Sequence, residues 1–118
     1  MRILDYLGWG ILHERMQIPC QDAAGYGSCA NGNTIMVLAD GAGSSKYARE
    51  AAQANVDAIM DYFRRTPVAE FARMSPEARV DAIIDRCQEQ IARTCGKGAP
   101  VHGSDVCATV LFAVQGDD

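Results

Sequence analysis

The chain has 118 residues, which suits a single domain, and its 48% hydrophobic and 22% charged residues are typical of a folded globular protein. A formal net charge of −4 provides no electrostatic basis for binding nucleic acid and disfavours anionic membrane surfaces. The sequence contains no apolar run near the ~20 residues of a membrane helix, and Asp5 interrupts the short apolar stretch at the N-terminus. We therefore expect a cytoplasmic protein with neither nucleic-acid nor membrane partners.

The five cysteines are odd in number and lack the close pairs of zinc-binding motifs. A disulfide framework usually has an even count. We therefore expect reduced thiols, several of them buried as small apolar side chains. The five are Cys20, Cys29, Cys87, Cys95 and Cys107.

In chain order, the first part of the sequence predicts three strands. Residues 8–12 combine two glycines with apolar side chains and predict an edge strand. Tyr26 and Cys29 are expected on a short second strand, which the Asn-Gly-Asn turn at residues 31–33 would end. Residues 34–39 are β-branched or aliphatic on both faces, which predicts a central strand.

The second part predicts two helices and a final strand. A first helix covers residues 46–65 and ends at Thr66-Pro67. A second begins with Ser75 as its N-cap, carries Pro76 as its first residue and stops at Gly96. A loop over residues 97–104 leads to a strand over residues 105–114. The expected apolar stripes are Ala48, Ala52, Val56, Ile59 and Phe63 on the first helix, and Val80, Ile83, Ile84, Cys87 and Ile91 on the second. The order β-β-β-α-α-β predicts an α+β layering with both helices on one face of a sheet.

Two aspartates stand out as candidate metal ligands. Asp40 ends the apolar strand and is followed at once by Gly41, Ala42 and Gly43, so backbone and ligand can approach closely there. A carboxylate beside exposed backbone carbonyls suits a hard cation such as Mg²⁺ or Mn²⁺. Asp22 supplies a second isolated carboxylate upstream. Taken singly, Asp22 is more typical of an ordinary turn, and Asp40 fits a strand-ending turn as well as it fits a metal ligand.

Three segments, in this order, resemble the metal-dependent serine/threonine protein phosphatases of type 2C. They are Gln21-Asp22-Ala23, the strand from Val37 that ends in Asp40-Gly41-Ala42-Gly43, and Cys107-Ala108-Thr109-Val110-Leu111. The resemblance implies a four-layer α-β-β-α sandwich of two antiparallel sheets flanked by helix pairs. Residues 1–118 would then be the N-terminal portion of that domain, truncated before the later metal motifs. Gly116-Asp117-Asp118 is expected to form the turn after the last strand and not to be one of these metal motifs.

The resemblance also implies a reaction and its residues. Family members hydrolyse phosphoserine and phosphothreonine in a phosphorylated protein substrate, with two Mg²⁺ or Mn²⁺ ions activating a water molecule. Carried over, Asp22 and Asp40 are metal carboxylates with catalytic roles, and the Gly41 carbonyl is a further metal ligand. His13 matches the spacing of a phosphate-binding arginine, and Arg15 is the alternative. Gln21 replaces an acidic residue of other members, and Ala42 replaces a histidine found in some.

The sequence is also compatible with two other functions. A non-catalytic, phosphatase-like fragment would bind a partner, its own missing half or a second copy through an uncovered sheet face. A phosphate- or nucleotide-binding loop is suggested by Gly41 to Lys46, which follows a strand and opens a helix. Ser45 and Tyr47 flank Lys46, whereas a P-loop requires glycine before the lysine and Ser or Thr after it.

Overall fold

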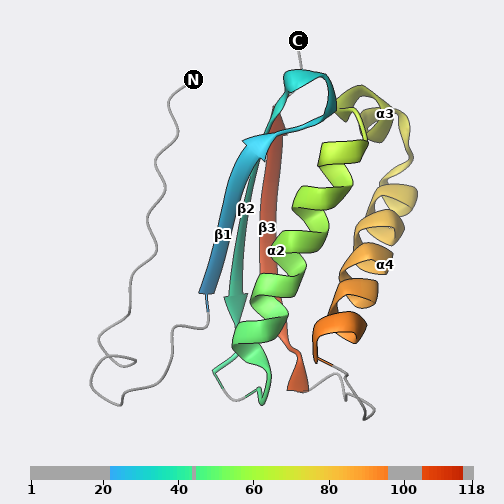
Figure 1. Cartoon of the computed structure of the whole chain (residues 1–118). Helices are drawn as coiled ribbons and strands as arrows, with labels where there is room; N and C mark the ends of the chain where they lie inside the picture. The colour runs from blue at the N-terminus through green and yellow to red at the C-terminus, as the bar shows by residue number, and fades with distance from the viewer. Residues whose placement is uncertain (1–21, 44, 96–104, 116–118) are drawn as a thin grey trace.

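The computed structural model describes residues 22–43, 45–95 and 105–115. The predicted strand over residues 8–12, the loop over residues 97–104 and His13 lie outside the described residues. The elements are β1 (Asp22–Ser28), the 3-10 turn η1 (Ala30–Gly32), β2 (Thr34–Gly41), α2 (Ala48–Arg65), α3 (Val68–Arg73), α4 (Pro76–Cys95) and β3 (Ala108–Gln115). The helices lie on one side of the sheet, which confirms the predicted α+β layering (Figure 1).

The described sheet is antiparallel throughout, in the order β1-β2-β3. β2 is central, as its apolar sequence predicts. The turn between β1 and β2 contains Gly32 at φ 81°, a left-handed conformation that glycine adopts without steric cost. The predicted strand around Tyr26 corresponds to β1 and is longer than expected. It begins at Asp22, and Cys29 follows it instead of belonging to it.

The helix α2 fills the space above the sheet. Its predicted stripe is fully confirmed, since Ala48, Ala52, Val56, Ile59 and Phe63 are all buried. The stripe meets the inward side chains of β2, Ile35 and Val37, which are completely buried. Alternation along β2 puts these side chains on the helix side, and the residues between them on the other face.

Close packing of α2 on β1 depends on a residue without a side chain. A Cβ built on Gly25 would lie 2.9 Å from Val56 Cγ1 and 3.3 Å from Met60 Cγ. The neighbouring Gly27 meets only the flexible end of Met60, at 3.2 Å. Gly25 therefore allows the helix to approach the first strand.

The α3 helix is an addition to the expected order. It follows Pro67, whose fixed φ suits the start of a helix, and ends at Arg73. Phe71 packs edge-on against Phe63, with ring centroids 4.9 Å apart, and near Phe112 of β3 at 6.3 Å. Since only six residues are helical, tertiary packing of Phe71 stabilises a segment too short to be helical alone.

The α4 helix starts as predicted but is less buried than its sequence suggests. The Ala78 amide donates to Ser75 Oγ at 3.2 Å, which confirms the predicted N-cap. Ile83 and Cys87 pack against the core. No residue of α4 is buried, however, and Val80 and Ile84 of its stripe are 55% and 45% exposed.

Candidate metal centre

The antiparallel register of β1 and β2 brings the two predicted carboxylates together. β1 begins at Asp22 and β2 ends near Asp40, and these two residues are direct partners across the strands. Because strand side chains alternate between faces, both belong to the face opposite the helices. The sheet therefore places Asp22 and Asp40 side by side at one end of its outer face.

The separation of Asp22 and Asp40 can be inferred from the hydrogen-bonding pattern between β2 and β3. The Ala42 amide donates to the Cys107 carbonyl at 2.9 Å, so even-numbered residues of β2 direct their backbone groups toward β3. Asp40 is one of them, and it therefore faces Asp22 as a non-hydrogen-bonded pair. In such pairs Cα atoms are about 4.5 Å apart and the side chains are at their closest.

Two like charges directly opposite each other destabilise a sheet. The two carboxylates are neighbours on one face, and carboxylate oxygens are ligands that Mg²⁺ and Mn²⁺ prefer. A bound divalent cation would offset their repulsion. The residues present thus fit one side of a metal site.

The backbone of Gly41 fits the same site. By the alternation that turns Asp40 toward β3, the odd-numbered Gly41 directs its carbonyl toward the β1 side, where Asp22 lies. Gly41 is buried at the end of the strand, and its partner in β3 is Ala108. Its carbonyl oxygen is therefore aimed at the flank of the strand that carries Asp22.

Thr109 is a neighbour that the site prediction had not included. It is the β3 partner of Asp40 and continues the row Asp22–Asp40–Thr109 across the outer face. Its hydroxyl is an additional oxygen beside the carboxylates. The Ala-Thr motif pointed to this strand, but only the β2–β3 register reveals which face Thr109 occupies.

Among the described residues, no group of three or more His, Cys, Asp or Glu side chains is close enough to hold an ion. The predicted phosphate-contacting His13 and its alternative Arg15 lie outside the described residues. The described part of the site therefore consists of two carboxylates, one carbonyl and one hydroxyl.

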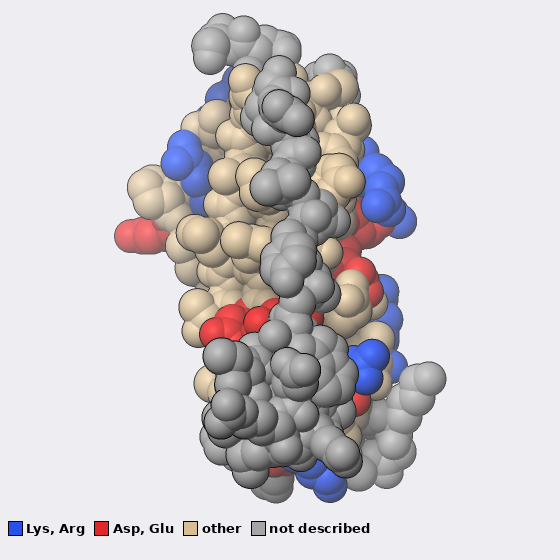
Figure 2. Space-filling model, turned by 90° about the vertical axis from the view of Figure 1, so that its left-hand side faces the viewer, with Lys and Arg blue, Asp and Glu red and all other residues tan. Residues whose placement is uncertain are grey.

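The outer face beyond this row is apolar. Its next two rows across the strands are Ala24–Leu38–Leu111 and Tyr26–Met36–Ala113. Leu38 is 48% and Leu111 69% exposed. Among the described residues, helices cover only the other face of β2. In the upper part of Figure 2, which shows this side of the molecule, the visible described residues are mostly tan, and acidic side chains lie below them.

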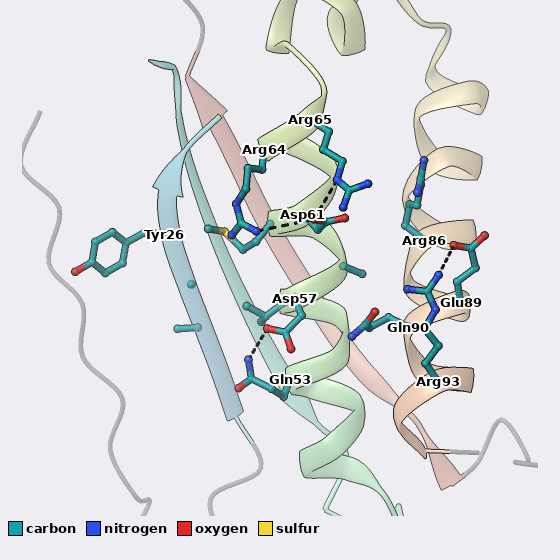
Figure 3. A pocket seen from close by; sticks show the side chains of 15 residues that line it. Tyr26, Gln53, Asp57, Asp61, Arg64, Arg65, Arg86, Glu89, Gln90 and Arg93 are labelled. Atoms are coloured by element: carbon teal, nitrogen blue, oxygen red, sulfur yellow. Dashed lines mark hydrogen bonds and ion pairs between the residues drawn. The ribbon is translucent and has the colours of Figure 1, made fainter. Parts of the chain in front are cut away.

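A separate cavity of about 600 Å³ runs over α2 between β1 and α4 (Figure 3). Its carboxylates are engaged by neighbours. Asp61 lies 3.3 Å from Arg65 and 3.9 Å from Arg64, and Glu89 lies 3.7 Å from Arg93. These exposed ion pairs contribute little to stability, and their charges largely cancel. The largely balanced charges of this cavity therefore differ from the two like charges of Asp22 and Asp40 on the sheet.

The described cysteines are free thiols that differ in burial. Burial raises the pKa of the Cys29 and Cys87 thiols, so both stay protonated at neutral pH. Cys107 is exposed just before β3. All four described cysteines are free thiols, as the sequence predicts for Cys29, Cys87, Cys95 and Cys107.

Comparison with known families agrees with the fold. The model of the family described as protein phosphatase 2C matches residues 9–118, and the chain belongs to this family. No curated protein and no solved structure matches significantly. Within the described residues, every helix is too short or too polar to cross a membrane.

Proposed function

We propose that this chain supplies the Asp22–Asp40 side of a divalent-metal site for hydrolysis of phosphoserine and phosphothreonine in proteins. The observation that carries the proposal is the cross-strand pairing of two like-charged residues on one face. Membership in the phosphatase 2C family supports the reaction class. Asp22, Asp40 and the Gly41 carbonyl would hold Mg²⁺ or Mn²⁺.

When bound, the metal ions supply an activated water molecule and offset charge on the phosphoryl oxygens. The chain's own contribution is to position ligands. Two hydrogen-bonded strands hold Asp22 and Asp40 at a defined separation, and rigid strand ends orient ligands more accurately than loops. His13 or Arg15 would contact the substrate phosphate, which requires a positive charge on that side chain.

The test is phosphate release from a phosphothreonine peptide with Mn²⁺, Mg²⁺ or a chelator, in parallel with Mn²⁺ binding by calorimetry. Asp40→Asn should lose most metal binding and any metal-dependent turnover, because it removes one of two ligand charges. The matched control is Asp81→Asn, which makes the same change at an exposed position on α4. Turnover that survives in Asp40→Asn or in excess chelator would contradict the mechanism.

A second function is favoured by the exposed outer face. A phosphatase-like domain that binds a partner without catalysis would use the apolar rows that contain Leu38 and Leu111. With two carboxylates the described site would hold a cation weakly, and activity of the 118-residue chain alone would be small. Such a face suits a second β-sheet, either from the rest of a sandwich or from another copy. Measurable Mn²⁺ binding without turnover, together with concentration-dependent association, would favour this function.

A further inference from the structure

The cavity over α2 is lined by charged side chains from both long helices (Figure 3). Its volume of about 600 Å³ is far larger than a single small ion needs and lies in the range of sites for drug-sized ligands. Its exposed arginines outnumber its carboxylates. The arginines are Arg64 and Arg65 of α2 and Arg86 and Arg93 of α4, and the carboxylates are Asp57, Asp61 and Glu89.

The positive charge of this cavity is concentrated at the C-terminal end of α2. Two arginines share the Asp61 carboxylate, which lies 3.9 Å from Arg64 and 3.3 Å from Arg65. Arg93, by contrast, has Glu89 as a partner of its own. One carboxylate therefore opposes two guanidinium groups in the last turn of α2. The helix dipole adds only about half a negative charge at this end, so a positive surplus remains.

Arg86 adds a third guanidinium group to the same end of the cavity. Among the described residues, no carboxylate pairs with Arg86. Its guanidinium carbon lies 6.0 Å from the ring centroid of Tyr62, a side chain that is only 7% exposed. This cation–π contact orients the guanidinium group without neutralising its charge. In Figure 3, Arg65 extends from α2 toward α4 and reaches the level of Arg86.

Two guanidinium groups from opposite sides of a groove suit an anion with several oxygen atoms. A guanidinium fork binds phosphate through two hydrogen bonds, and a phosphate dianion balances two such groups, whereas a carboxylate balances one. The ion pair between Arg65 and Asp61 is exposed and weak, so Arg65 can turn to a phosphate at little cost. Nucleic acid fits poorly, because the chain carries a net charge of −4 and the basic surface is small.

This end of the cavity is remote from the acidic row. The α2 helix begins near the end of β2 that carries Asp40, and it runs for 18 residues, about 27 Å, before it ends at Arg65. It also covers the face of the sheet opposite to Asp22 and Asp40 (Figure 1). A phosphate held by Arg65 and Arg86 is therefore not the one that metal ions at the acidic row would hydrolyse.

We propose that Arg65 and Arg86 form an accessory binding site for a phosphoserine or phosphothreonine of a protein substrate, separate from the residue that is dephosphorylated. The two guanidinium groups bracket the phosphate, and the rest of the cavity holds neighbouring residues of the substrate. Gln53 and Gln90 line that part and offer amide groups to the substrate backbone. The assignment to a substrate rests on the proposed function, whereas the phosphate contact itself does not depend on catalysis.

The probe is a short peptide with one phosphothreonine, titrated into the isotope-labelled 118-residue chain and followed by amide chemical shifts. A chelator in the buffer removes any metal-dependent phosphate release from the measurement. We expect saturable shifts around Arg65 and Arg86, with a dissociation constant on the order of 1 mM. Arg86→Gln should weaken binding at least about fivefold, because it removes one of the two phosphate ligands. Arg73→Gln, a matched change at an exposed arginine of α3 outside the cavity, should leave the affinity within about twofold.

The same peptide without its phosphate should cause no saturable shifts. Equal binding of the two peptides, or unchanged affinity in Arg86→Gln, would overturn the proposal. Inorganic phosphate should bind more weakly than the phosphopeptide, because it makes no contact with the rest of the cavity. Equal affinities would assign the cavity to free phosphate and overturn its role in substrate binding.

This measurement also separates the accessory site from the proposed function. Phosphopeptide binding that depends on Arg86, together with no metal-dependent turnover, would contradict the proposed function and leave the phosphate contact in place. Metal-dependent turnover with no binding at Arg86 in chelator would contradict the accessory site alone.

Discussion

Replacing Asp40 with asparagine should change stability in opposite directions without and with metal. Asp40 faces Asp22 in a close, non-hydrogen-bonded pair. Like charges opposite each other cost roughly 0.2–1 kcal/mol, which Asp40→Asn would recover in metal-free buffer. For a domain of this size, that gain corresponds to a melting temperature about 1–4 °C higher.

Adding Mn²⁺ should reverse the ranking of the two proteins. If two carboxylates and a carbonyl bind Mn²⁺ with a dissociation constant on the order of 1 mM, about 10 mM metal stabilises the parent chain by roughly 1.4 kcal/mol. This gain corresponds to about 5 °C in melting temperature. Asp40→Asn should retain less than half of it, because one of the two ligand charges is absent.

The assay is thermal unfolding followed by circular dichroism, with and without Mn²⁺, for the parent, Asp40→Asn and Asp81→Asn. Asp81→Asn controls for the change in net charge, since Asp81 is exposed on α4 and distant in sequence from the acidic row. It should keep the full response to Mn²⁺. A metal-free Asp40→Asn protein that melts lower than the parent and responds equally to Mn²⁺ would refute the reasoning.

Three further predictions concern the packing and the exposed surfaces. Gly25→Ala should lower the free energy of unfolding by about 1–3 kcal/mol in urea titrations, because its Cβ would lie 2.9 Å from a Val56 methyl. Gly27→Ala should lower it less, since the added Cβ meets only the flexible end of Met60. Equal effects of the two substitutions would contradict this account. Leu111→Lys should reduce self-association in sedimentation experiments with little loss of stability, because this side chain is 69% exposed, and unchanged association would argue against the outer face as the contact. Iodoacetamide should label Cys107 well before Cys29 at pH 8, because burial raises the Cys29 pKa above its ordinary value and keeps that thiol neutral. Mass spectrometry of the labelled peptides measures the order of labelling. Labelling of Cys29 before Cys107 would contradict this prediction.

Local patterns in the sequence were sufficient to predict most elements. The 3.6-residue period from Ala48 to Phe63 predicts α2, and burial confirms it. Ser75 and Pro76 mark the start of α4, where the Ser75 hydroxyl accepts the predicted hydrogen bond. These predictions succeed because helix caps and hydrophobic periodicity depend on residues within a few positions of one another. The short α3 was missed, since its stability comes from Phe71 packing against distant aromatic rings.

The pairing of Asp22 with Asp40 could not be predicted from the sequence alone. Their residue types and their positions in family motifs predicted a metal site, but Asp22 and Asp40 are separated by a turn and two strands. Only the antiparallel register makes them partners, and a shift of one residue would put one of them on the helix side. Likewise, the apolar pattern of α4 predicted burial, whereas the three described strands leave Val80 and Ile84 exposed. The sequence thus determined which segments are helices and strands, because those preferences are local. The tertiary structure decided which side chains meet and which faces stay open, because pairing and packing join residues far apart in the chain.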